Sequence, residues 1–191
     1  LKNTEQELPC STVNDYAIIC PLPTNHSSVF STRDRYFRVR EMKIFFSVGE
    51  PSGDLHGSNL IRALRSRQPD IECIGFGGPK MVAAGARLHE DLTRQAIMGI
   101  WRIASAIPTL LLLLLRADRI FRHERPDAVV LIDFPGFNWW IAWRAKQRRI
   151  PVIYYGTPQL WAWAPWRTKK MRRLTDHVLC KLPFEQDWFR Q

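Results

Sequence analysis

Features that mark secreted, metal-binding or nucleic-acid-binding proteins are scarce in this sequence. The chain has only four cysteines, none of them in a CxxC pair, which argues against a disulfide framework and favours a reducing compartment. Its five histidines form neither an HxxxH spacing nor a metal-site spacing with cysteine, so we expect no metal ion and no cofactor. The sequence contains no internal repeat and no RNP-like, helix-turn-helix or zinc-finger pattern.

What the sequence does have is the composition of a globular domain and a strong excess of positive charge. Its 191 residues are enough for one domain with a sizeable core, and 46% of them are hydrophobic while 24% are charged. The formal net charge of +10 is concentrated at one end, because residues 139–191 hold eleven basic and three acidic side chains. This region is expected to attract phosphate, acidic lipid headgroups or nucleic acid, although a solvated basic face has the same composition.

The first 41 residues differ from the rest of the chain. They begin with leucine, show no sustained hydrophobic period, and mix proline, asparagine, serine and threonine. The apolar run at residues 16–23 is short and follows no basic region, so it is a poor signal peptide. We expect residues 1–41 to be a disordered tail or a mis-called start. Met42 is then the natural beginning of a domain formed by residues 42–191.

Strands and helices alternate from residue 43 onward. Short apolar, β-rich runs predict strands at residues 43–48, 71–76, 128–132, 151–155 and 177–181. Helical spacing predicts a short helix ending at Gly85 and longer ones at residues 55–67, 139–147, 167–174 and 183–189. A strand, a helix and a strand within about thirty residues form a βαβ unit. The pattern therefore predicts an α/β fold with an open, doubly wound, Rossmann-like parallel sheet.

A long apolar run at residues 97–115 ends in six consecutive leucines. A membrane-spanning helix needs about 20 mostly apolar residues. Arg102 within the run would cost roughly 2.5–3.5 kcal/mol on insertion, and Pro108 divides the run. Two interpretations remain equally favoured: a helix partly laid into the membrane interface, and a buried helix packed on the sheet.

Polar loops that contain glycine follow several of the predicted strands. In open parallel sheets, ligands bind outside the carboxyl ends of the strands. These loops lie at residues 49–54, 77–80 and 133–138, with a further loop at residues 157–163. The loop at residues 49–54 matches neither the dinucleotide nor the P-loop pattern, and Glu50 and Asp54 would repel phosphate. A polar sugar or acceptor hydroxyls fit it better. Asp54 has an alternative role as a helix N-cap, whereas Glu50 has no obvious one.

Asp133 is the residue most suited to chemistry. It follows five apolar residues at the end of a predicted strand, where a carboxylate is partly desolvated and can accept a proton. The alternative is that Asp133 hydrogen-bonds the following turn or caps the next helix. Asn138 is better placed for that cap, which leaves Asp133 free for catalysis.

Aromatic and basic residues dominate the loop and helix that follow residue 154. Trp161 and Trp163, with two tyrosines before them, are equally compatible with stacking on a sugar or acyl chain and with core packing. Residues 167–174 alternate basic with apolar side chains, which favours an anionic membrane or a phosphorylated substrate.

Six short segments occur together in the order and spacing of one protein family. They are SVGEPSGD at 47–54, GGPKM at 77–81, MG at 98–99, IDFPGFN at 132–138, YYGTPQLWAW at 154–163 and LPFE at 182–185. Each segment is weak alone, but the ordered set is specific. Residues 42–191 therefore resemble the first half of the lipid-A-disaccharide synthases.

The resemblance implies the N-terminal, acceptor-side domain of a GT-B glycosyltransferase, with a reaction site between two Rossmann-like domains. Family members join UDP-2,3-diacylglucosamine to 2,3-diacylglucosamine 1-phosphate, releasing UDP and forming the lipid A disaccharide. They are peripheral proteins on the cytoplasmic face of the inner membrane, and no nucleic-acid partner is expected. Asp133 would be the general base. The substrate-binding residues would be Glu50, Ser52, Gly53, Asp54, Met98, Gly99, Asn138, Trp161 and Trp163.

Two departures from the family pattern stand out. The family's second domain, with most UDP-sugar contacts, is not in this sequence, so we expect these 191 residues alone to have no transferase activity. Turnover by the purified chain would refute that expectation. Ala164 and Pro165 also stand where many members continue straight into basic residues.

Two other functions remain as alternatives. One is a different UDP-sugar enzyme of the same architecture, such as an epimerase or a peptidoglycan-type glycosyltransferase, but neither accounts for the GEPSGD and DFPGFN loops together. The other is a basic nucleic-acid-binding module, for which the long apolar run has no purpose.

Overall fold

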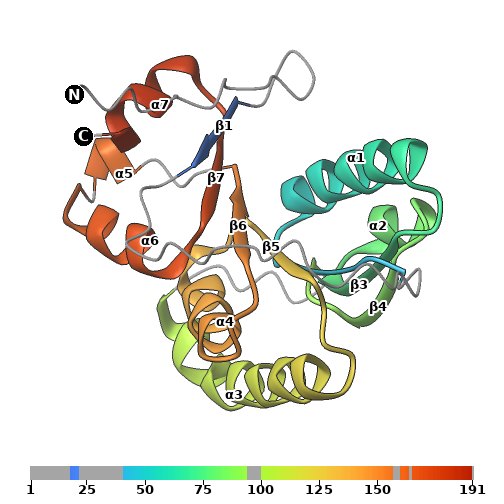
Figure 1. The fold of residues 1–191 in the computed structure, drawn as a ribbon. Helices are drawn as coiled ribbons and strands as arrows, with labels where there is room; N and C mark the ends of the chain where they lie inside the picture. The colour runs from blue at the N-terminus through green and yellow to red at the C-terminus, as the bar shows by residue number, and fades with distance from the viewer. Residues whose placement is uncertain (1–17, 22–40, 94–99, 157–159, 164, 191) are drawn as a thin grey trace.

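The computed structural model describes residues 18–21, 41–93, 100–156, 160–163 and 165–190. A single seven-stranded sheet runs through the described residues (Figure 1). Its strands are β1 Ile18–Pro21, β2 Lys43–Val48, β3 Glu72–Gly77, β4 Arg87–Asp91, β5 Ala128–Ile132, β6 Val152–Tyr155 and β7 His177–Cys180.

The order of the strands locates the expected ligand crevice. The sheet has the order β1-β7-β6-β5-β2-β3-β4, in which β1 is antiparallel to β7 and the other pairs are parallel. The chain moves outward from β2 to β4 and then returns to build β5 on the other side of β2. The order therefore reverses between β2 and β5, and in such sheets ligands bind at the carboxyl ends of these two strands. This arrangement confirms the predicted α/β doubly wound fold.

Helices cover both faces of the sheet (Figure 1). One face carries α1 Pro51–Arg67 and α2 Pro79–Ala83, and the other carries α3 Ile100–His123, α4 Pro135–Gln147 and α6 Thr168–Leu174. The shorter elements α5 Leu160–Trp163 and η2 Pro165–Arg167 lie between β6 and α6, and α7 Pro183–Arg190 follows β7.

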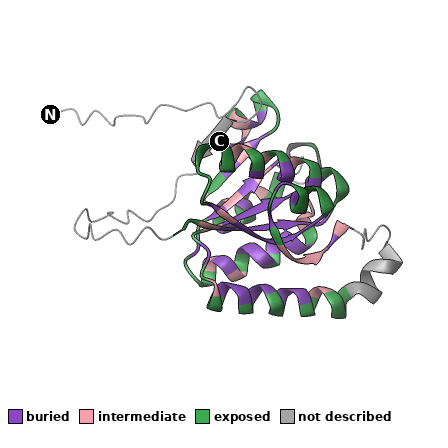
Figure 2. Ribbon diagram, turned by 90° about the vertical axis from the view of Figure 1, so that its right-hand side faces the viewer, coloured by how far each residue is buried: buried purple, intermediate pink, exposed green. Residues whose placement is uncertain are grey.

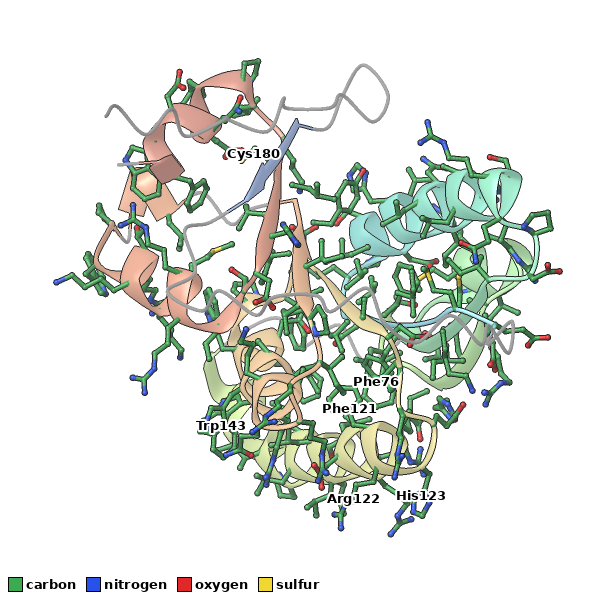
Figure 3. The ribbon with its side chains drawn as sticks, viewed as in Figure 1. Phe76, Phe121, Arg122, His123, Trp143 and Cys180 are labelled. Carbon is green, nitrogen blue, oxygen red and sulfur yellow. The ribbon has the colours of Figure 1, made fainter. Side chains whose placement is uncertain are left out.

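The central strands are buried on both sides, which explains their nearly continuous apolar sequences. On the α3 side, the ring of Phe45 packs edge-on against Phe76 and Phe121, with centroids 5.3 and 5.0 Å apart. Figure 3 shows Phe76 and Phe121 lying between the sheet and α3. On the other side, Phe46 and its neighbours pack against α1 and α2. The free thiols of Cys73 and Cys180 are buried, as expected for small apolar side chains.

The long apolar helix α3 packs on the sheet with one side and exposes leucines on the other. Leu113 and Leu114 are buried against the core, whereas Leu111, Leu112 and Leu115 are 56%, 67% and 57% exposed. Figure 2 shows the alternation of buried and exposed residues along this helix, at the lower edge of the view. Pro108 does not divide the helix, which runs through it. Among the described residues, no helix is both long enough and apolar enough to cross a membrane.

All five predicted strands are confirmed to within one residue at each end. Helices α1 and α4 begin four residues earlier than predicted, at Pro51 and Pro135. Proline has no N–H to lose in a first helical turn and its fixed φ suits that position, so both prolines start a helix rather than precede one. Residues 160–163 form one helical turn where a loop was predicted.

Two strands were not predicted. The edge strand β4 has the polar sequence RLHED, which lacks the apolar character on which the strand predictions relied. Strand β1 lies within residues 1–41, where no sustained hydrophobic period predicts a strand. It forms by pairing with β7. The rest of residues 1–40 lies outside the described residues.

Ion pairs join the strands at the amino-terminal edge of the sheet, opposite the expected crevice. The ammonium group of Lys43 lies 2.8 Å from Glu72 and 2.9 Å from Glu124, and the guanidinium of Arg87 lies 2.6 and 2.5 Å from the same two carboxylates. Burial alone would raise the pKa of Glu124, but hydrogen bonds from Arg87 and Lys43 outweigh it and lower the pKa to about 2.

This lowered pKa predicts a loss of stability in acid. The contribution of Glu124 is fully present above its ordinary pKa of 4.5 and is lost as the pH falls from there towards about 2. In urea titrations from pH 7 to pH 3, Glu124→Gln should be less stable than the parent at pH 7, and the difference should shrink on acidification. The exposed Glu41 provides the matched control, Glu41→Gln. A pH-independent difference for Glu124→Gln would contradict this account.

Candidate active site

The loop after β2 presents two polar side chains at the carboxyl-terminal edge of the sheet. Glu50 is the N-cap residue of α1, and its carbonyl accepts a hydrogen bond from the N–H of Asp54 at 3.0 Å. The Glu50 side chain makes no capping hydrogen bond. Glu50 and Ser52 are both exposed, so both are available to a ligand.

Asp54 was a candidate N-cap for α1, but it caps α2 instead. It lies within the first turn of α1, and only 2% of its surface is exposed. Its carboxylate accepts hydrogen bonds from the backbone N–H groups of Gly78, Lys80 and Met81 at 3.2, 3.0 and 3.0 Å. The capped helix comes from a distant part of the sequence, so local spacing could not reveal the partner. Asp54 thus joins two loops of the edge and has little surface left for a substrate.

The glycines of the first loop allow close packing. A Cβ atom at Gly49 would lie 2.5 Å from the ring of Phe134, and one at Gly53 would lie 2.8 Å from the side chain of Val48. Gly53 belongs to the first turn of α1 and is buried against β2, so it does not lie at an open surface. The loop after β2 therefore lies directly against the loop after β5.

The chain turns sharply where β5 ends. Asp133 and Phe134 have φ angles of 49° and 46°, in the left-handed region. Aspartate adopts this region more readily than most residues, but phenylalanine rarely does. Such residues cost about 1–3 kcal/mol each, persist only where their surroundings hold them, and cluster at functional sites.

Two partly buried hydrogen bonds hold this turn in place. The carbonyl oxygen of Asp133 accepts one from the Asn138 amide at 2.7 Å and one from the Tyr154 hydroxyl at 2.8 Å. Burial, followed by the negative charges of Asp133 and Glu50, raises the pKa of Tyr154 above its ordinary value. Tyr154 is therefore a neutral donor at physiological pH.

Asn138 is not the N-cap that its sequence position suggested. It is the fourth residue of α4, whose N-cap is Phe134, and its side chain is fully buried. Its amide oxygen accepts a hydrogen bond from Ser47 Oγ at 2.6 Å, and its amide nitrogen also lies 3.3 Å from the carbonyl oxygens of Ser47 and Ile132. Asn138 thus ties the carboxyl end of β2 to that of β5. All of its polar atoms are used inside the protein, which does not favour a direct contact with substrate.

The Asp133 carboxylate lies at the switch point of the sheet, where the strand order reverses between β2 and β5, and it is 20% exposed. Its Oδ1 atom accepts a hydrogen bond from Lys181 Nζ at 3.2 Å. Lys181 was not predicted from the sequence, although it directly follows β7 and the rule about strand ends applies to it equally. Within the described residues, no cluster of histidine, cysteine, aspartate or glutamate side chains could hold a metal ion.

An apolar groove begins beside Asp133. It lies between α3 and α4 and has a volume of about 750 Å³. Its lining includes Phe134 and Phe137 from the start of α4, Leu111 and Leu114 from α3, and Trp140 further along α4. The groove therefore connects the strained turn to the exposed leucines of α3.

A second groove, of about 630 Å³, lies between α4 and α6. Basic and aromatic side chains line it together, among them Trp143, Trp166, Lys169, Lys170 and Arg173. Figure 3 labels Trp143, which lies on α4 between the two grooves. Trp140, Trp143 and Trp166 are 59%, 40% and 70% exposed.

Several predicted site residues cannot be placed fully. Met98 and Gly99 lie outside the described residues. The backbones of Trp161 and Trp163 belong to α5, but their side chains lie outside the described set.

Comparisons with known proteins identify the family of this chain. The model of the family described as lipid-A-disaccharide synthetase matches residues 44–191. The lipid-A-disaccharide synthase of Myxococcus xanthus is 38% identical over 149 residues, which cover 78% of this chain and 39% of the relative. That of Trichlorobacter lovleyi is 36% identical over 152 residues, covering 80% and 40%. The chain thus spans about two fifths of the length of these relatives.

Among solved structures, the chain is similar to MurG of Acinetobacter baumannii, with a TM-score of 0.48, 15% identity, and coverage of 72% of this chain and 40% of that one. The chain belongs to the lipid-A-disaccharide synthase family.

Proposed function

We propose that this chain forms the acceptor-side half of a glycosyltransferase that makes the lipid A disaccharide. The donor would be UDP-2,3-diacylglucosamine and the acceptor 2,3-diacylglucosamine 1-phosphate. The observation that carries the proposal is the Asp133 carboxylate, held at the switch point by a left-handed turn and three neighbouring side chains. Family membership supports the choice of substrates.

In the proposed step, Asp133 accepts the proton of the acceptor 6-hydroxyl group while the hydroxyl oxygen attacks C1 of the donor sugar. The new C1–O bond forms on the face opposite UDP. The bond between C1 and the UDP phosphate oxygen breaks, and UDP leaves with the electron pair. Glu50 and Ser52, exposed at the start of α1, would hydrogen-bond acceptor hydroxyls.

The apolar groove between α3 and α4 is where we place acyl chains of the acceptor. It starts at Phe134, next to the proposed base, and leads to the exposed leucines of α3. A diacyl sugar whose reactive hydroxyl lies at Asp133 can lay an acyl chain into this groove. Burying such chains contributes about 0.8 kcal/mol per methylene group.

The same surface suits a peripheral position on the cytoplasmic face of the inner membrane. Exposed leucines of α3 and tryptophans of α4 lie beside the groove that contains Lys169, Lys170 and Arg173. Aromatic rings suit the interface between lipid and water, and each basic residue near an anionic surface contributes about 1 kcal/mol.

Membrane attachment can be tested on this chain directly, by sedimentation with vesicles of phosphatidylethanolamine and phosphatidylglycerol. The triple variant Leu111→Ser, Leu112→Ser, Leu115→Ser should bind roughly tenfold or more weakly, because each lost leucine removes part of about 1.5–3 kcal/mol of burial. The double variant Leu55→Ser, Val82→Ser, on exposed positions of the other face, is the matched control. Equal losses in both variants would argue against a specific membrane-facing surface.

We expect transfer in a protein of the relatives' length, of which this chain spans about two fifths. We call the fusion of this chain to the C-terminal part of the Myxococcus xanthus relative, beyond the matched region, the extended protein. It should release UDP only when both diacylated sugars are supplied. UDP release from UDP-N-acetylglucosamine without the diacyl acceptor would favour another UDP-sugar enzyme. Salt-dependent RNA binding with no response to the diacyl sugars would favour a nucleic-acid-binding module.

A further inference from the structure

Lys181 reaches Asp133 across the end of an intervening strand. Asp133 follows β5 and Lys181 follows β7, with β6 between them. Gly156, directly after β6, leaves room for the lysine, because a Cβ atom there would lie 2.3 Å from Lys181 Cε. Gly156 also has a φ of 73°, a conformation that favours glycine. The end of β6 is therefore shaped to let the lysine side chain pass.

The backbone of Lys181 is fixed as well. The carboxylate of Glu185, only 1% exposed, accepts hydrogen bonds from the N–H groups of Lys181 and Leu182 at 3.0 and 3.1 Å. Both ends of the lysine are thus held, the backbone by Glu185 and the ammonium group by Asp133. The Lys181 side chain is 42% exposed, so these contacts rather than burial hold it.

We infer that Lys181 is a positioning residue that orients the Asp133 carboxylate for proton transfer. Its ammonium group engages Oδ1, and no hydrogen bond from another described residue occupies Oδ2. Oδ2 is then the atom that accepts the proton of the acceptor hydroxyl. This role rests on the proposed function, since it requires Asp133 to be the base. A misplaced catalytic group can cost about 10²-fold in rate even when it is still present.

The test compares Lys181→Met and Lys181→Arg in the extended protein, with initial rates measured over a range of acceptor and donor concentrations. Lys181→Met should lower kcat by roughly 10- to 100-fold and leave both KM values within about twofold. Lys181→Arg should recover most of the rate, because its guanidinium also donates to a carboxylate. Arg67→Met, which changes an exposed basic residue at the C-terminal end of α1, away from the crevice, should keep the parental rate. Urea unfolding of each variant measures whether its free energy of unfolding matches that of the parent.

A double variant separates positioning from other roles. If Lys181 acts only through the carboxylate, Lys181→Met should cause little further loss in a protein that already carries Asp133→Asn. Full additivity of the two losses would overturn the inference. So would an unchanged kcat in Lys181→Met, or a raised acceptor KM with unchanged kcat, which would make the lysine a substrate-binding group. Failure of the parent to transfer at all would instead count against the proposed function.

Discussion

Replacing Asp133 with asparagine is expected to lower kcat of the extended protein by roughly 10²–10⁴-fold, the usual contribution of a general base. Asparagine has nearly the same shape, tolerates the left-handed backbone, and can still accept a hydrogen bond from Lys181 through its amide oxygen. It cannot take up the hydroxyl proton. The loss should therefore appear in kcat with little change in stability or in KM.

The measurement is UDP release at saturating concentrations of both diacylated sugars. Asp70→Asn, the same substitution at an exposed position after α1, should keep the parental rate. A rate for Asp133→Asn within about threefold of the parent would remove Asp133 from the base role, because a base contributes far more than that.

Asn138→Ala is expected to be the most damaging change to the architecture of the site. It removes the amide that satisfies Ser47 Oγ and the carbonyl oxygens at the ends of β2 and β5, all of them buried or partly buried. Leaving such groups without partners costs about 1–3 kcal/mol each, and some of this cost is relieved by water or local movement. We expect the free energy of unfolding of this chain to fall by about 3 kcal/mol.

Urea unfolding of the 191-residue chain, followed by circular dichroism, measures this loss. Asn59→Ala, at an exposed position of α1, should change stability by no more than about 0.5 kcal/mol. If Asn138→Ala unfolded at the same urea concentration as the parent, the Asn138 amide would not stabilise the ends of β2 and β5. In the extended protein, the same variant should also lose transfer activity, because the turn that holds Asp133 is no longer fixed.

Most of the fold could be predicted because its strands are buried on both faces. Runs such as AVVLI in β5 read as parallel strands without any knowledge of their partners. Strand β4 escaped prediction because it lies at the edge of the sheet, where polar residues are tolerated. The early starts of α1 and α4 were signalled by Pro51 and Pro135, and recognising proline as a first-turn residue would have placed them.

The site was predictable in position but less so in the division of roles. Glu50 and Asp133 come together at the switch point because the strand order brings β2 beside β5. Asp54 instead caps α2, and Asn138 binds Ser47, both distant in sequence; neither caps the helix that local spacing suggested for it. Whether a polar residue faces a ligand or a buried backbone group depends on tertiary contacts, which a single sequence does not contain.

The central claim is that the acceptor sugar binds at the carboxyl ends of β2 and β5. Nuclear magnetic resonance tests it most directly, by titrating the ¹⁵N-labelled chain with a soluble, short-chain form of 2,3-diacylglucosamine 1-phosphate. The account predicts the largest amide shifts at Glu50, Asp133 and Lys181. Shifts confined to the opposite edge, around Lys43 and Arg87, or no shifts at millimolar ligand, would contradict it.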